Sequence, residues 1–219
     1  MAVSAEAWKR LLSSGSARRH PPGAVLLHQG APAAHVLILV AGRVKVLHTS
    51  PDGDVLVLAI RGPGEILGDI SVLGGDTRSA TVVALDECET RVIPADRFRQ
   101  LVHTAGLEAQ LLRHAMERIR EGEAWRAELA ALPAGTRLVR ALTRFAEAGR
   151  DDSGAALGPV DIGLGQAELG QATGLARSTV AAELAKLRDL GLIATAHRRI
   201  VILDPRGLRA LAPPDRPSV

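Results

Sequence analysis

Residues 166–187, QAELGQATGLARSTVAAELAKL, are the stretch that decides the fold. They read as two short helices broken at Gly174, because a glycine permits the sharp backbone turn between them. In the second helix, apolar residues recur at the spacing of one helical face, at Val180, Leu184 and Leu187. That face would pack inward and leave small and polar residues outward. The pattern predicts a helix-turn-helix of the kind that reads DNA.

A short hairpin is expected directly after these helices. The runs LIAT and RIVILD flank a turn at residues 196–198, which puts His197, Arg198 and Arg199 at the tip. The helix pair alone could be an αα-hairpin without a role in DNA binding, but the wing that follows it favours the winged DNA-binding version. The basic excess lies in the same part of the chain, since residues 133–219 carry 12 basic and 9 acidic side chains.

The residues expected to contact DNA follow from this geometry. Arg177, near the start of the second helix, can donate two hydrogen bonds to guanine, and such a contact discriminates between bases by roughly 1–3 kcal/mol. Ser178 and Thr179 can reach a base edge or a phosphate, and Ala182 shares their outward face. Phosphate contacts are expected from four further residues, each of which could equally be a solvated surface side chain: Gln166, Lys186, Arg198 and Arg199.

Upstream of the helix pair, the sequence pattern is first typical of β-strands and then of helices. Residues 23–94 alternate short apolar runs with glycine turns, which predicts a small barrel or jelly roll. A short helix is expected from Pro94 and a longer one over residues 107–132. Six residues of the long helix form a stripe with the imperfect spacing of a coiled-coil seam: Leu112, Ala115, Ile119, Gly122, Arg126 and Leu129. The stripe predicts either a dimerisation helix or an ordinary helix packed on the barrel.

The composition excludes several classes of protein. Aromatic residues make up only 2% of the 219 residues, so single-stranded nucleic acid is not expected to stack on aromatic platforms. The single cysteine, Cys88, rules out an internal disulfide and is too few for a cysteine-ligated iron–sulfur cluster within one chain. The apolar runs are too short to span a membrane, and the N-terminus lacks the apolar region of a signal peptide. We expect a cytoplasmic protein that does not bind membranes.

The stretch GDISVLGGDTRSAT, residues 68–81, places Asp69 and Arg78 at the two ends of one tight loop. One interpretation is a salt bridge that holds the loop shut. The other is a cradle for a phosphate on a sugar. In the cradle, backbone N–H groups near Asp69 would face the anion, Arg78 would supply a permanent charge and a two-pronged donor, and Ser79 would add a hydroxyl.

The order of a glycine-punctuated barrel, a long helix and a winged helix-turn-helix resembles the cyclic-AMP receptor and fumarate–nitrate regulator (Crp–Fnr) family over nearly the whole chain. The resemblance implies an α+β fold in three parts: a cyclic-nucleotide-binding jelly roll in residues 1–104, a dimerisation helix in 105–132 and a winged helix-turn-helix in 133–219. It also implies a homodimeric regulator whose partners are double-stranded DNA and RNA polymerase. The nucleotide-binding residues it implies are Gly68, Asp69, Ile70, Arg78, Ser79, Gly122 and Glu123.

Several positions depart from the family pattern. Asp69 stands where cyclic-nucleotide binders usually carry the longer Glu, and Gly122 and Glu123 stand where cyclic-AMP binders offer hydroxyl groups to the adenine. On the DNA-reading helix, Ser178 replaces an acidic residue and Ala182 a basic one. These departures predict an operator other than the best-known one of the family, and they leave open whether the nucleotide is cyclic AMP.

Two alternatives remain open at this point. The chain could be a DNA-binding regulator that is constitutive or that senses another nucleotide, a redox signal or haem. It could also be a metalloenzyme of the jelly-roll (cupin) type, but the candidate ligands His28, His35 and His48 are scattered singly. We therefore expect no catalytic residues and no metal.

Overall fold

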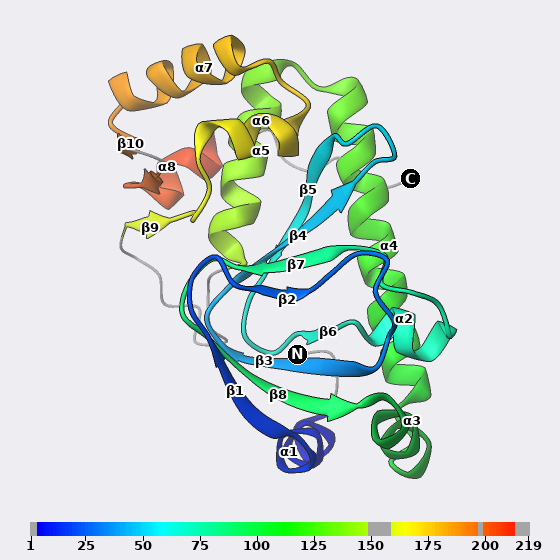
Figure 1. Cartoon of the computed structure of the whole chain (residues 1–219). Coiled ribbons are helices and arrows are strands. Elements are labelled where there is room, and N and C mark those ends of the chain that lie inside the picture. The colour runs from blue at the N-terminus through cyan, green and yellow to red at the C-terminus, as the bar shows by residue number, and fades with distance from the viewer. Residues whose placement is uncertain (1–3, 149–158, 197–198, 213–219) are drawn as a thin grey trace. The chain divides into compact units, whose positions relative to one another are not determined.

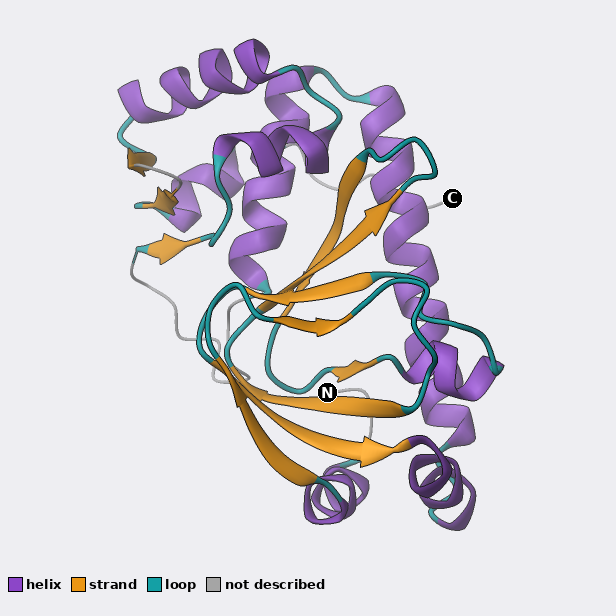
Figure 2. Ribbon diagram, viewed as in Figure 1, coloured by secondary structure: helices purple, strands orange, loops and turns teal. Residues whose placement is uncertain are grey.

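The computed structural model describes residues 4–148, 159–196 and 199–212. The chain divides into two compact units, Met1–Ala124 and Trp125–Val219. Each unit has its own core and is described by itself. The helices and strands of both are drawn in Figures 1 and 2.

The first unit is built around two antiparallel four-stranded sheets. Their strand orders are β1-β8-β3-β6 and β2-β7-β4-β5. Such faced antiparallel sheets form the expected jelly roll, so the predicted α+β fold is confirmed. The bounds of the strands are β1 Ser16–His20, β2 Val25–Leu27, β3 His35–Ala41, β4 Val44–Thr49, β5 Val55–Arg61, β6 Ile66–Leu67, β7 Thr81–Ala84 and β8 Cys88–Pro94.

The local sequence explains most of these strands. β3 buries four consecutive apolar residues, and a turn that contains Pro51, Asp52 and Gly53 joins β4 to β5. Gly53 adopts a φ of 89°, a conformation that glycine tolerates far better than other residues. The apolar pattern begins only after Gly23 and so misses β1. That strand lies at a sheet edge and leaves four of its five residues exposed, so it carries no apolar alternation to read.

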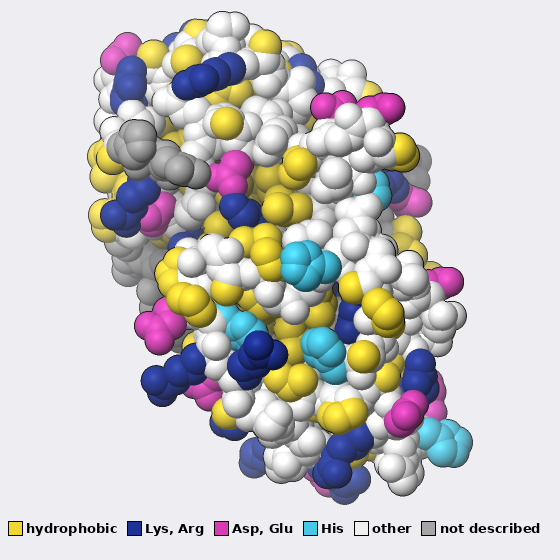
Figure 3. Space-filling model, viewed as in Figure 1, with side chains coloured by type: hydrophobic (Ala, Val, Ile, Leu, Met, Phe, Trp, Pro, Cys, Tyr) yellow, Lys and Arg dark blue, Asp and Glu magenta, His cyan; other side chains and the backbone are white. Residues whose placement is uncertain are grey.

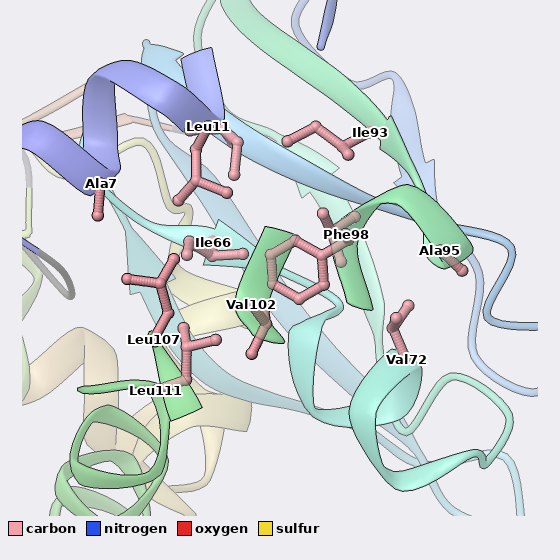
Figure 4. Close-up of a cluster of buried hydrophobic side chains, with 12 residues drawn as sticks. Ala7, Leu11, Ile66, Val72, Ile93, Ala95, Phe98, Val102, Leu107 and Leu111 are labelled. Carbon is pink, nitrogen blue, oxygen red and sulfur yellow. The ribbon is translucent and has the colours of Figure 1, made fainter. Parts of the chain in front are cut away.

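Four helices belong wholly or mainly to the first unit: α1 Ala5–Ser14, α2 Asp69–Gly74, α3 Ala95–Thr104 and α4 Glu108–Ala131. The predicted short and long helices correspond to α3 and α4. Phe98 of α3 is fully buried at the centre of an apolar cluster that also takes in Leu11, Val72 and Leu111 (Figure 4). Burial of large apolar side chains is the main stabilising term in such a core. This cluster therefore holds α1, α2 and the start of α4 against the sheet that contains β3.

α4 carries very different faces along its length. Leu111 and His114 are buried, whereas Leu112 and Ile119 of the predicted stripe are exposed. Among the other members of that stripe, Arg126 is exposed, and Ala115, Gly122 and Leu129 are half-buried. One face of the helix therefore packs on the barrel, and another presents apolar side chains outward. The dimerisation helix stays a prediction.

The second unit contains α5 Ala134–Glu147, β9 Val160–Asp161, α6 Gln166–Thr173, α7 Arg177–Asp189, β10 Ile193–Ala196, β11 Arg199–Ile202 and α8 Pro205–Ala210. β10 and β11 form the expected hairpin, and β9 adds a third antiparallel strand. Leu138, Leu142 and Phe145 of α5 are buried. The pattern did not predict β9 or α8. His197 and Arg198 of the predicted turn lie outside the described residues, as do residues 149–158.

No helix among the described residues combines the length and the apolar character that crossing a membrane requires.

Candidate functional site

The loop of residues 68–81 begins at Gly68, between β6 and α2. Gly68 has a φ of 81°, and a Cβ atom at this position would collide with the guanidinium of Arg78. Any other residue here would therefore be strained and would displace Arg78. Glycine is required at this point for a close approach as well as for a turn.

Arg78 is 96% buried, with 4% of its surface exposed, and its hydrogen bonds go to backbone carbonyls. Its Nη1 donates to the oxygen of Gly68 at 2.8 Å, and its Nη2 donates to the oxygen of His35 on β3. Burial lowers the pKa of the Arg78 guanidinium, and the charge of nearby Asp69 opposes that shift. An arginine keeps its charge under such a shift, so a fixed cation lies at the inner wall of the loop.

Asp69, the first residue of α2, is only 3% exposed. Its Oδ1 accepts a hydrogen bond at 3.1 Å from Nη1 of Arg118, which lies on α4. Within the described part of the chain, the side chain of Arg78 donates to the two carbonyls and not to Asp69. The salt bridge between the two loop ends, one of the two interpretations of the sequence, is therefore replaced by a link from the loop to α4.

A second carboxylate, Glu65, lies beside this link. Its Oε2 is 3.4 Å from Nε2 of His114 and 3.6 Å from Nη2 of Arg118. Burial by itself would raise the pKa of Glu65, but the contact with His114 and the charges of Arg118 and Arg61 outweigh burial and hold that pKa below its ordinary value. The carboxylate therefore stays ionised at neutral pH.

The remaining predicted nucleotide-binding residues surround this buried set. Ile70 and Ser79 are exposed on the loop, and the carbonyl of Ser79 is 3.4 Å from Nδ1 of His48. On α4, Gly122 follows Arg118 by one helical turn and so shares its face, while the neighbouring Glu123 is exposed. Among the predicted nucleotide-binding residues, the two loop ends, Asp69 and Arg78, are the buried ones.

Sequence reasoning missed Glu65, His114 and Arg118. The available signal was the spacing on α4, where His114, Arg118 and Gly122 recur every four residues on one helical face. No cluster of three or more His, Cys, Asp or Glu side chains able to hold a metal ion occurs among the described residues.

α7 has the geometry that the sequence predicts for a DNA-reading helix. Val180, Leu184 and Leu187 of α7 are buried, and Gly174 ends α6 with a φ of 62°. A Cβ atom on Gly170 would come within 2.9 Å of the carbonyl oxygen of Leu175, so a small residue is needed where the chain turns. α7 is thus fixed by its inner face, which leaves its outer face free.

The outer face of α7 carries the predicted base-reading residues. Arg177, Ser178 and Ala182 are exposed, and Thr179 is half-buried. Figure 3 shows Lys and Arg side chains on the surface over this helix. The arrangement can present an arginine fork to a base edge in a major groove.

The predicted phosphate contacts include two cations that have partners within their own unit. Lys186 pairs with Glu183 at 2.8 Å, and Nε of Arg199 donates to Asp161 at 2.8 Å. Exposed ion pairs of this kind contribute only about 0–1 kcal/mol, so a phosphate could compete for either cation. Gln166, the first residue of α6, is half-buried.

We expect the Glu65 carboxylate to give the first unit an acid-sensitive contribution to stability. A carboxyl whose folded pKa is lowered stabilises the fold above its ordinary value, here 4.5, and loses that contribution as the pH falls through the lowered pKa. Glu65→Gln should lower the free energy of unfolding at neutral pH and make its decline between about pH 5 and about pH 3 shallower. Urea unfolding across this range, with the exposed Glu6→Gln as control, measures both effects. An unchanged acid decline would contradict the assignment.

Comparison with known families gives two matches that cover different parts of the chain. Residues 17–105 match the cyclic nucleotide-binding domain, and residues 136–211 match the Crp-like helix-turn-helix domain. The first match contains the loop of residues 68–81, and the second contains α6 and α7.

Two similar proteins align with this chain over most of its length. The chain is 29% identical over 201 residues to the cAMP-activated global transcriptional regulator CRP of Escherichia coli, and the alignment covers 89% of this chain and 93% of that protein. The solved structure of the c-di-GMP responsive global regulator CLP of Xanthomonas campestris aligns with a TM-score of 0.71 and 24% identity, over 91% of this chain and 99% of that one. This second likeness bears on the fold alone.

A shorter match is to Acetyltransferase Pat of Mycolicibacterium smegmatis, with 40% identity over 98 residues. That alignment takes in 45% of this chain but only 29% of the relative, so the acetyl transfer in its name belongs to a much longer protein.

Proposed function

We propose that this chain, which belongs to the Crp–Fnr family of transcription regulators, is a homodimer whose affinity for DNA changes when a nucleotide binds at the loop of residues 68–81. The family is one of regulators and not of enzymes. The observation that carries the proposal is the buried ion pair between Asp69 of the loop and Arg118 of α4. It joins the candidate ligand site to the helix that leads into the DNA-binding unit.

The proposed ligand carries a phosphate and a sugar hydroxyl, as a cyclic nucleotide does. Arg78 and Ser79 would bind the phosphate, while Asp69 would accept a hydrogen bond from the hydroxyl. Asp69 already binds Arg118, so the hydroxyl would compete with or rearrange that pair. A ligand regulates only if it interacts differently with two states of the protein, and the Asp69–Arg118 contact supplies such a difference.

DNA binding is assigned to the outer face of α7 and its surroundings. Arg177 would read guanine, and Ser178 and Thr179 would contact a base edge or phosphate beside it. The small side chain of Ala182 would let α7 approach the bases closely. Gln166, Lys186, Arg198 and Arg199 would bind phosphates. The activity takes place in the cytoplasm with RNA polymerase as a further partner, as the function of a DNA-binding regulator requires.

The proposed dimer is formed through α4. Leu112, Met116 and Ile119 are 62%, 46% and 57% exposed and lie at i, i+4 and i+7. Apolar side chains at this spacing form one continuous stripe, which a second α4 can cover by knobs-into-holes packing. Two copies would present two α7 helices to half-sites about 34 Å apart on a palindromic operator.

A constitutive regulator, or one that senses a different signal, is the second candidate. The observation in its favour is that both bonds of the Arg78 fork already go to carbonyls within the barrel. Calorimetry with cyclic AMP, cyclic GMP and cyclic di-GMP, together with a visible absorption spectrum for haem, separates it from the first. Binding of none of these would favour the constitutive form.

We expect Arg177→Ala and Arg78→Ala to separate the two proposed activities. Loss of the base-reading fork should weaken binding to a selected operator by roughly 1–3 kcal/mol. Arg78→Ala should leave DNA contact intact but abolish any change on adding nucleotide. Gel shifts with a duplex selected from a random pool measure both, and Arg206→Ala on α8 controls for the general loss of a positive charge. Unchanged operator affinity of Arg177→Ala would refute the role of α7.

The dimer can be tested independently of any ligand. Ile119→Glu places a charge in the exposed stripe, and the burial of an unpaired charge is costly, so we expect the variant to become monomeric. Sedimentation velocity gives the answer directly, with Glu117→Ala on another face of the same helix as control. A wild-type protein that sediments as a monomer would overturn the proposed dimer.

A further inference from the structure

The two units of the chain meet inside α4 rather than at its end. The first unit ends at Ala124 and the second begins at Trp125, whereas the proline that separates α4 from α5 is Pro133. The last residues of α4, 125–131, therefore belong to the DNA-binding unit. The contacts of this tail segment explain why.

Glu128 is the main polar anchor of the tail segment. Its Oε1 accepts a hydrogen bond from Nη1 of Arg140 at 2.6 Å, and both of its oxygens are 3.2 Å from Nη2 of Arg144. Both arginines lie on α5, and the side chains of Glu128 and Arg140 are each only 15% exposed. Hydrogen bonds between ionised partners are among the strongest in proteins, above all when they are shielded from water.

Two further contacts hold the same segment. The guanidinium of Arg144 lies 4.2 Å from the centre of the Trp125 ring, and that ring is 5.8 Å from the buried ring of Phe145. Nη1 of Arg137 donates to the carbonyls of Leu129 and of Thr173, the last residue of α6. The tail segment is thus bonded to α5 and, through Arg137, to the helix pair that carries α7.

The preceding turn of α4 has a different attachment. Arg118 pairs with Asp69, and Glu121 pairs with Arg61 on β5 at 3.0 Å, so both belong to the barrel. Between Glu121 and Trp125 lie Gly122, Glu123 and Ala124. Glycine has the greatest backbone freedom of any residue inside a helix, so α4 is held least firmly by its own backbone at Gly122.

We propose that Glu128 is a positioning residue for DNA binding, which fixes the tail segment to α5 so that the pivot between the units lies at Gly122–Ala124 and not at Leu132–Pro133. The DNA-reading helix then moves together with the tail segment as one body. Arg118, which meets the candidate ligand loop, lies a single turn before this pivot. The role of Glu128 in DNA binding rests on the proposed function, but the place of the pivot does not.

Amide hydrogen exchange of the full chain tests the place of the pivot. Backbone bonds that span Gly122–Ala124 should open most readily, so within α4 the least protected interior amides should be those of residues 123–127. Amides of residues 128–131 should be protected like those of α5. Unbroken protection from residue 112 to residue 131, with the weak point at Leu132–Pro133, would overturn the proposal. Either pattern is readable without a ligand or an operator.

Glu128→Gln tests the anchor itself. With the charge gone, Arg140 and Arg144 lose their shared partner, and the exchange of amides 128–131 should accelerate at least tenfold while that of residues 112–121 stays unchanged. Made in a Trp8→Phe background, the same variant should also expose Trp125 to acrylamide quenching. Glu117→Gln is the matched control on the same helix. Unchanged exchange and quenching in Glu128→Gln would show that Glu128 does not have this role. If the variant fails to fold, the exchange pattern of the wild type still decides where the pivot lies.

Discussion

A carboxylate that is almost fully withdrawn from water needs a cation, and Asp69 finds it in Arg118 at 3.1 Å. An unpaired charge in this place would be severely destabilising, so the loop of residues 68–81 and α4 must be held together as long as both groups are ionised. This pair adds a specific link to the apolar cluster around Phe98, which packs α2 and the start of α4 against the sheet. The neighbouring Glu65 and His114 lie around the same contact.

Three sets of contacts along α4 link it to both units of the chain. Leu111 packs in the apolar cluster of the first unit, and Arg118 binds the buried Asp69. Leu112 and Ile119 are exposed, and the last turns of the helix are bonded through Glu128 to α5 of the second unit. Ion pairs, which depend on precise geometry, therefore help to determine how the helix is held. Such contacts are sensitive to a competing ligand in a way that an apolar interface is not.

The sequence predicted the parts of the site that depend on local order. Gly174, Val180 and Leu184 are close in the chain, so helical periodicity and turn chemistry were enough to place α6 and α7. The loop ends Asp69 and Arg78 were also found, but their partners were not, because Arg118 lies 49 residues away and the two carbonyls bound by Arg78 carry no sequence signal. β1 was not predicted because an exposed edge strand has no apolar pattern.

The most direct test of the account is a double-mutant cycle on the link between loop and helix. The free energy of unfolding of the first unit is measured for the wild type, Asp69→Asn, Arg118→Gln and the double variant. A buried, specific pair predicts a coupling energy within the range of about 0.5–3 kcal/mol found for residues in contact. Strictly additive effects of the two substitutions would mean that loop and helix are held by something else, and the proposed route from ligand to DNA would be contradicted.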